Sequence, residues 1–268
     1  MTDFLASMAA SSRLRADEAR AKLGGAELER RARNAPPPPP LALSDSGFDL
    51  IAEAKLAGPS QRRITRRPPA ALAVELAGSG AVALSILTEP AVFAGALSHL
   101  EAASRSVSVP TMRKDFLVDP IQVLEARAAG ASGTLLIARL LDPALLAEMT
   151  DLTLSLGMFA LVEVFEASDL DVASTVFDRE ILVGVNARDL ATLEVSSERH
   201  AELFPSLPAH LPAVAESGVV APSDARRVAE LGYRLALVGT SLTRNPDPAA
   251  AARALIEAGR ATMAGSPS

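Results

Sequence analysis

The segment AELGYRLALVG, residues 229–239, carries the pattern that decides the fold of this chain. A helix-like stretch ends at a glycine and leads directly into a short apolar strand. The same order recurs in ELAGSGAVALSIL (75–87) and in RAAGASGTLLIA (127–138). A unit of helix, glycine and strand that repeats along a chain is what successive βα modules produce.

Outward from these segments, eight apolar strand candidates alternate with amphipathic, helix-like stretches. The candidates are Asp49–Lys55, Ala81–Thr88, Pro110–Arg113, Thr134–Ala138, Phe159–Val164, Ile181–Asn186, Ala213–Glu216 and Leu235–Gly239. Eight strands that alternate with helices favour a closed parallel barrel over an open doubly wound sheet. We therefore predict an α/β fold, a (β/α)8 TIM barrel.

An N-terminal helical extension is predicted before the barrel. Residues 3–23 and 26–34 show helical spacing, and Gly24-Gly25 separates the two runs. Pro36 to Pro40 then form a stiff polyproline II strut. We predict an extension with its proline-rich strut over residues 1–47 and a catalytic barrel over residues 48–268.

The composition restricts the chemistry. The hydrophobic fraction is 49% but aromatic residues make up only 3%, so the core must be aliphatic, as in parallel sheets covered by helices. The chain has no Cys and only three scattered His, which excludes thiolate chemistry and argues against a histidine-built metal site. A net charge of −6 argues against nucleic-acid binding.

The chain start does not read as a signal peptide, and no apolar run reaches the roughly 18 residues of a membrane span, so we expect a cytoplasmic protein.

Polar residues recur at the ends of the predicted strands. Because an unpaired buried charge is expensive, such residues in an apolar strand indicate a site. In a (β/α)8 barrel these ends all meet at the catalytic face. Two lysines and three glutamates at one mouth would provide acids, bases and charge stabilisation for proton transfer. The residues are Glu53, Lys55, Arg113, Lys114, Asp115, Phe116, Glu163, Asn186, Arg188, Asp189 and Glu216.

Glycines and hydroxyls follow the last two strands. Glu216-Ser217-Gly218 ends the seventh strand, and Gly239-Thr240 ends the eighth. Phosphate sites of these barrels are built there, because glycine lets backbone N–H groups approach phosphate oxygens. A different glycine motif, Gly78-Ser-Gly80-Ala-Val-Ala83, resembles a dinucleotide fingerprint but ends a helix and opens a strand, the reverse of what that motif requires.

Several of these segments together resemble the indole-3-glycerol phosphate synthase family. They are IAEAKLAGPS (51–60), LSILTE (84–89), PTMRKDFLVDPIQVLEARAAGAS (110–132), LVEVF (161–165), VGVNARDLATLEV (183–195), AVAESGV (213–219) and LVGTSLTR (237–244). The N-terminal helix pair followed by prolines is also similar to that family's extension. The resemblance spans nearly the whole chain, and the combination of RKDF, NxRDL and AESG at these intervals is specific.

The resemblance implies a carbon–carbon lyase of tryptophan biosynthesis that needs neither cofactor nor metal. Its substrate would be 1-(2-carboxyphenylamino)-1-deoxyribulose 5-phosphate, which loses CO₂ and water as the indole ring closes. Contact with other tryptophan-pathway enzymes is a further expectation. The implied catalytic residues are Lys114 as general acid, Glu163 as base or proton relay, Lys55 as the group that polarises the reacting end, and Glu53 and Asn186 as orienting groups. The implied substrate-binding residues are Ser60, Phe116, Arg188, Glu216, Ser217, Gly218, Leu237, Gly239 and Thr240.

The first loop of the barrel departs from the family pattern. Gly58 stands where the family usually has Ser, and Gln61-Arg62-Arg63 replaces the usual Lys-Gly after Ser60. The four arginines between residues 58 and 69 either assist an anionic substrate or form a solvated face. Two other functions therefore stay open: a paralogue that acts on a modified anthranilate-derived phosphate in specialised metabolism, and a weakened barrel that serves as a binding or scaffold protein.

Overall fold

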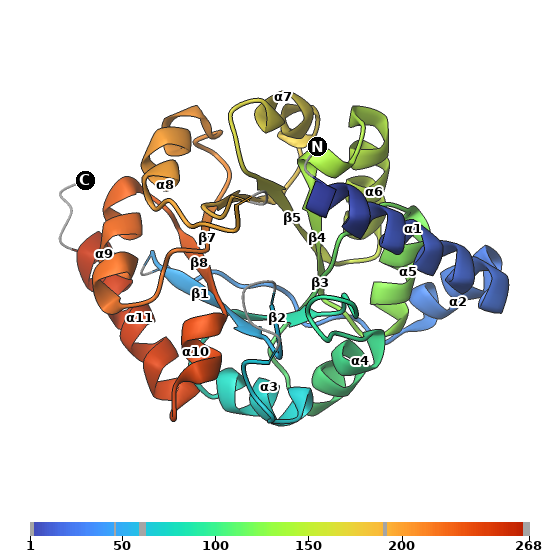
Figure 1. Ribbon diagram of the computed structural model, residues 1–268, viewed down its shortest axis with the longest axis horizontal. Helices are drawn as coiled ribbons and strands as arrows, with labels where there is room; N and C mark the ends of the chain where they lie inside the picture. Colours follow the sequence, from blue (N-terminus) through green and yellow to red (C-terminus); the bar gives the residue numbers. More distant parts are fainter. Residues whose placement is uncertain (1–2, 46, 59–62, 190–191, 265–268) are drawn as a thin grey trace.

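The computed structural model describes residues 3–45, 47–58, 63–189 and 192–264. Within them, eight parallel strands close into a barrel in which each strand pairs with its neighbours in the chain. Figure 1 shows the strands enclosed by a ring of helices. The predicted (β/α)8 barrel is confirmed. The strands are β1 (Asp49–Ala54), β2 (Ala83–Leu87), β3 (Thr111–Lys114), β4 (Gly133–Ile137), β5 (Phe159–Val164), β6 (Leu182–Asn186), β7 (Ala213–Glu216) and β8 (Leu235–Val238).

The helices that cover the barrel follow the strands in turn. They are α3 (Pro69–Ala77), α4 (Leu97–Ser106), α5 (Pro120–Ala128), α6 (Pro143–Ser155), α7 (Asp169–Ala173), α8 (Glu198–Leu203), α9 (Pro222–Leu231), α10 (Thr240–Arg244) and α11 (Pro248–Ala264). Single 3-10 turns lie at η1 (Ala138–Leu140), η2 (Ser174–Val176) and η3 (Phe204–Ser206). Each predicted strand overlaps an observed one, and the ends differ by at most two residues.

Local chemistry fixes where these helices begin and end. Asp119 and Asp142 accept hydrogen bonds from the backbone N–H groups of the first turns of α5 and α6, and a proline follows each of them. Gly232 ends α9 in the left-handed conformation, with φ 105°. Gly78 caps the end of α3, and β2 begins shortly afterwards, so the glycines of the 78–83 motif end a helix as predicted.

The core of the barrel is aliphatic, and two glycines make room for its few aromatic rings. Gly133 on β4 pairs with Phe159 on β5, and a Cβ at position 133 would lie 2.5 Å from that ring. Gly259 in α11 leaves the same kind of space for Phe48, which is fully buried before β1. Packing of rings against bare backbone explains these glycines. Among the described residues, no helix is both long and apolar enough to cross a membrane.

The N-terminal extension consists of α1 (Asp3–Leu23) and α2 (Gly25–Asn34). In Figure 1, α1 runs from the mouth of the barrel outward over α5 towards α2. Leu5 and Met8 of α1 and Ala32 of α2 are buried in the same core as the barrel. Arg127 of α5 donates a hydrogen bond to the Ala35 carbonyl, which holds the start of the proline segment against the barrel. The helices predicted before residue 47 are therefore present and lie against the barrel.

Candidate active site

A cavity of about 470 Å³ opens at the carboxyl-terminal ends of the strands, and every strand contributes to its wall. The structure brings together thirteen of the fourteen site residues expected from the sequence. Those that line the cavity are Glu53, Lys55, Lys114, Phe116, Glu163, Asn186, Arg188, Glu216, Ser217, Gly218, Leu237, Gly239 and Thr240. Ser60 lies outside the described residues. Convergence at this end follows from the parallel order of the strands, which aims all their last residues at one mouth.

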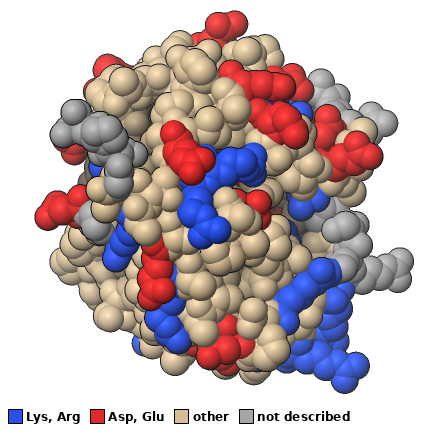
Figure 2. All heavy atoms as spheres, turned by 90° about the vertical axis from the view of Figure 1, so that its left-hand side faces the viewer, with Lys and Arg blue, Asp and Glu red and all other residues tan. Residues whose placement is uncertain are grey.

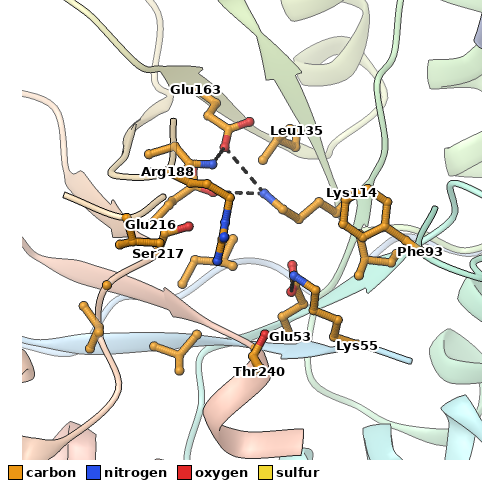
Figure 3. A pocket seen from close by; sticks show the side chains of 18 of the residues that line it. Glu53, Lys55, Phe93, Lys114, Leu135, Glu163, Arg188, Glu216, Ser217 and Thr240 are labelled. Carbon is orange, nitrogen blue, oxygen red and sulfur yellow. Dashed lines mark hydrogen bonds and ion pairs between the residues drawn. The ribbon is translucent and has the colours of Figure 1, made fainter. Parts of the chain in front are cut away.

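Lys114 forms the centre of the site. Its Nζ lies 2.9 Å from Oε2 of Glu216 and 3.7 Å from Oε1 of Glu163, as Figure 3 shows. Asn186 donates a hydrogen bond from Nδ2 to the same Glu163 oxygen. The ends of β3, β5, β6 and β7 thereby hold an ammonium group, two carboxyl groups and an amide in one cluster. We call Lys114, Glu163, Asn186 and Glu216 the central cluster.

The protonation of the central cluster is set by burial and by an excess of carboxyl groups. Burial alone would lower the pKa of Lys114, but the charges of Glu163, Glu216 and Glu53 outweigh it and raise that pKa. Burial also raises the pKa of Glu216 to about 8, and the neighbouring Glu163 adds to this rise while Lys114 opposes it. At neutral pH Lys114 therefore stays charged, and Glu216 keeps its proton.

Lys55 and Glu53 form a second pair at the end of β1. Lys55 Nζ lies 3.6 Å from Glu53 Oε1 and 5.4 Å from the centre of the Phe93 ring, close enough for a cation–π contact. A Cβ at Gly58 would lie 3.0 Å from Cε of Lys55. The glycine in this unusual loop therefore leaves space for the end of the Lys55 side chain.

Arg188 lines the cavity from the loop after β6. Its Nη1 donates to the Leu193 carbonyl at 2.7 Å, and its backbone N–H donates to Oδ1 of Asn186 at 2.9 Å. A single antiparallel bridge joins Arg188 to Val195. Asn186 is thus held at both ends of its amide, by Arg188 and by Glu163, which fixes its orientation.

Aromatic and aliphatic side chains form the apolar wall. Phe93 packs against Phe116 with ring centres 6.1 Å apart, and Phe4 of α1 meets Phe116 edge-on at 6.0 Å. Leu135, Ile137 and Leu237 complete this wall. The sequence reasoning missed Phe4, because it lies 112 residues before Phe116. It also missed Phe93, which follows the recognised segment at 84–89 and carried no pattern of its own.

The corner beyond β7 and β8 is built from glycines and hydroxyl-bearing residues. Ser217 and Gly218 both have positive φ, 61° and 74°, which turns the chain sharply after Glu216. Ser241, a further residue that sequence reasoning missed, lines the cavity, and its buried hydroxyl has no hydrogen-bond partner within the described part of the chain. Gly239 has a second reason to be glycine, since a Cβ there would lie 2.3 Å from Oε1 of Glu53.

A buried ionic network holds the strand that carries Lys114. Asp115, the next residue, accepts two hydrogen bonds from Arg15 of α1, at 2.6 and 2.8 Å, and one from the hydroxyl of Thr88 at 2.6 Å. Burial would raise the pKa of Asp115, but these partners and Arg113 hold it below its ordinary value. The N-terminal helix is thereby tied to the residue beside the central lysine.

The described arginines of the first loop lie apart from the central cluster. Arg67 pairs with Glu75 at 3.1 Å and donates to the Pro246 carbonyl, so it joins the loop to α3 and to the segment before α11. Arg63 and Arg66 are exposed, and neither is among the described residues that line the cavity. Figure 2 shows charges of both signs on the face at the left of Figure 1, with basic side chains gathered at its lower right edge. The solvated-face interpretation therefore fits Arg63 and Arg66, and Arg62 lies outside the described residues.

The fold and the site together define a class of protein. It is a (β/α)8-barrel enzyme whose mouth combines an ammonium donor, carboxyl groups and an aromatic wall with a corner of glycines and hydroxyls. In the described residues, no group of three or more His, Cys, Asp or Glu is arranged to hold a metal ion.

Sequence similarity to known proteins identifies the family within this class. The family model for indole-3-glycerol phosphate synthase matches residues 5–255. The chain is 43% identical over 236 residues to indole-3-glycerol phosphate synthase of Mycobacterium avium (strain 104), with 87% of this chain and 86% of that one covered. It is 42% identical over 251 residues to the enzyme of that name from Mycobacterium tuberculosis (strain CDC 1551 / Oshkosh), with 92% of each chain covered. The chain belongs to the indole-3-glycerol phosphate synthase family.

Solved structures of lower identity share the fold alone. The tryptophan synthase alpha subunit from Legionella pneumophila aligns with a TM-score of 0.58 at 16% identity, covering 81% of this chain and 93% of that one. The 3-hexulose-6-phosphate synthase from Salmonella typhimurium aligns with a TM-score of 0.64 at 11% identity, covering 80% and 99%.

Proposed function

We propose that the protein closes the indole ring of 1-(2-carboxyphenylamino)-1-deoxyribulose 5-phosphate and releases CO₂ and water, as a carboxy-lyase of tryptophan biosynthesis. The family relationship supports the reaction, and the central cluster supports its chemistry. The observation that carries the proposal is the position of the Lys114 ammonium between two carboxyl groups, at the mouth of a barrel with a phosphate-type corner.

Lys114 is proposed as the general acid of ring closure. The ring carbon that bears the carboxylate attacks the sugar carbonyl, and the oxygen of that carbonyl takes a proton from Lys114. Loss of CO₂ then returns the bonding electrons to the ring and restores its aromaticity. A charged donor acts twice here, because it stabilises the developing oxyanion and also supplies the proton.

Glu163 is proposed as the base or proton relay of the final dehydration. The new hydroxyl takes up one proton and leaves as water. The carbon between it and the ring nitrogen gives up another proton, which forms the last double bond of the indole. Glu163 lies 3.7 Å from Lys114, and Asn186 holds its carboxylate. Ring closure leaves Lys114 neutral. Its Nζ is close enough to the carboxyl groups of Glu163 and Glu216 to regain a proton from them.

The remaining wall is proposed to hold the substrate. Phe116, Leu237, Phe93 and Phe4 would contact the aromatic ring. Ser217, Gly218, Gly239 and Thr240 would bind the phosphate, with Lys55 and Glu53 at the reacting end. Arg188 and Glu216 complete the polar side.

The direct test is incubation with the carboxyphenylamino deoxyribulose phosphate while indole fluorescence is followed. We expect product at catalytic enzyme concentrations. Tight binding without product would favour the scaffold function instead, and turnover only of a ring-substituted substrate would favour the specialised paralogue. We also propose a cytoplasmic location and contact with other tryptophan-pathway enzymes, which fractionation and co-purification would test.

A further inference from the structure

Gly184 is the middle residue of β6, and it has no polar side chain to offer the site. It is on β6, in register with Glu163 on β5 and Val214 on β7. A Cβ at this position would lie 2.2 Å from Oε1 of Glu216 and 3.2 Å from its Cδ. The carboxyl group of Glu216 therefore occupies the space that a side chain at position 184 would fill.

The backbone gives no other reason for a glycine at this position. Gly184 is not among the glycines with positive φ, so an alanine would adopt the same backbone conformation. Gly133 and Gly259 face the apolar rings of Phe159 and Phe48, which take no part in the site. Gly184 instead faces the free end of an ionisable side chain that the site uses.

The space at Gly184 decides where the Glu216 carboxyl group lies. Glu216 is at the end of β7, and its backbone is in register with Asn186. Its carboxyl group nevertheless turns back along the strand to lie against Gly184, whose register partner on β5 is Glu163. In that position it lies against Glu163 and bonds to Lys114 at 2.9 Å. The same closeness to Glu163 contributes to the raised pKa of Glu216.

We propose that Gly184 is a positioning residue for the reaction, because its missing side chain lets Glu216 share the Lys114 ammonium with Glu163. This inference rests on the proposed function, in which Lys114 and Glu163 carry the proton transfers. Any larger residue at position 184 moves the Glu216 carboxyl group towards the mouth of the barrel and separates the two carboxyl groups.

The test is Gly184→Ala, compared with Gly78→Ala as a matched control. An added Cβ at Gly78 meets nothing closer than 3.5 Å, and Gly78 lies at the end of α3, outside the site. An ordinary carbon–oxygen contact of about 3.3 Å requires the Glu216 carboxyl group to move by about 1 Å in the variant. A misplacement of that size lowers kcat by up to about 100-fold, so we expect a 10- to 100-fold loss with KM little changed.

The mechanism of this loss is tested by a double-mutant cycle with Glu216→Ala. Without the Glu216 side chain the added methyl group keeps only one close contact, 3.1 Å to Cδ1 of Leu161, so Gly184→Ala should cause little further loss of kcat in that background. In the Gly184→Ala single variant, the limb of the pH–rate profile that reports Glu216 should move to lower pH, because Glu216 becomes less buried and leaves Glu163. Equal losses in both backgrounds, or an unmoved profile, would overturn the inference.

Two outcomes separate this inference from the proposed function. If the wild type forms no product from the carboxyphenylamino deoxyribulose phosphate, the proposed function fails. If the wild type is active and Glu216→Ala and Lys114→Met lose activity, but Gly184→Ala keeps it, only the role of Gly184 fails. Should Gly184→Ala not fold, thermal melting of Gly184→Ala/Glu216→Ala decides, since removal of the Glu216 side chain must restore folding if the space argument is right.

Discussion

Replacement of Lys114 by methionine tests the centre of the proposed mechanism. Methionine keeps the length and much of the volume of the lysine side chain but removes its proton and its charge. General acid catalysis commonly contributes about 10²–10⁴-fold, and the charge lost beside the developing oxyanion adds to this. We therefore expect kcat to fall by at least about 10³-fold, which corresponds to roughly 4 kcal/mol of transition-state stabilisation.

Substrate binding should survive this change. The close contacts of the Lys114 ammonium are to Glu216 and Glu163, whereas the ring of Phe116 packs against Phe93. Neither the proposed aromatic wall nor the corner at Ser217 and Thr240 depends on that ammonium. The dissociation constant, measured by calorimetry with the substrate, should therefore change by less than about tenfold, which is about 1.4 kcal/mol. Turnover is followed through the fluorescence of the indole product at saturating substrate.

Lys114→Arg serves as the matched control. Arginine retains the positive charge between the two carboxyl groups but does not release a proton under working conditions. Activity between that of the wild type and that of Lys114→Met would separate the contribution of charge from that of proton donation. A near-normal kcat in Lys114→Met would refute the role assigned to Lys114, however well the variant folds.

Three further predictions concern protonation, the N-terminal helix and the aromatic wall. Because the pKa of Glu216 is raised to about 8 in the folded protein, the stability linked to its protonation is present below about pH 4.5 and is lost as the pH rises through about 8. Glu216→Gln should therefore gain Tm relative to the wild type as the pH rises from about 4.5 to about 8, and a pH-independent difference would contradict the raised pKa. Arg15→Ala removes one partner of the buried Asp115, which keeps Arg113 and Thr88. We expect the free energy of unfolding to fall by about 2–3 kcal/mol, and calorimetry should show a fall in Tm of roughly 5–10 °C. An unchanged Tm would show that the Arg15–Asp115 pair adds no net stability. Phe93→Ala should raise KM by about tenfold while kcat stays within a few-fold of the wild-type value. The reason is that the Phe93 ring contacts Lys55 and Phe116 and not the central cluster. A loss confined to kcat would instead give Phe93 a role in the chemical steps.

The barrel itself was predictable because its signals are local. Each helix–glycine–strand unit is encoded within about a dozen residues, and proline, aspartate and glycine mark the helix ends through their own backbone chemistry. The strand ends were predictable for the same reason, since a charge at the end of an apolar run is visible in the sequence. The parallel order of the strands then brings Glu53, Lys114, Glu163 and Glu216 to one mouth without further information.

The contacts inside the site were not predictable, because they join residues far apart in the chain. Phe4 reaches the pocket only because α1 packs across the mouth, and the pairing of Arg15 with Asp115 spans 100 residues. The carboxyl group of Glu216 lies beside Lys114 in the space left by Gly184, which is on β6, three strands along the barrel from β3. The sequence alone determined the barrel, the mouth and the set of ionisable groups. Only the tertiary structure decided their pairing and protonation, because burial and distance between side chains arise when the strands close.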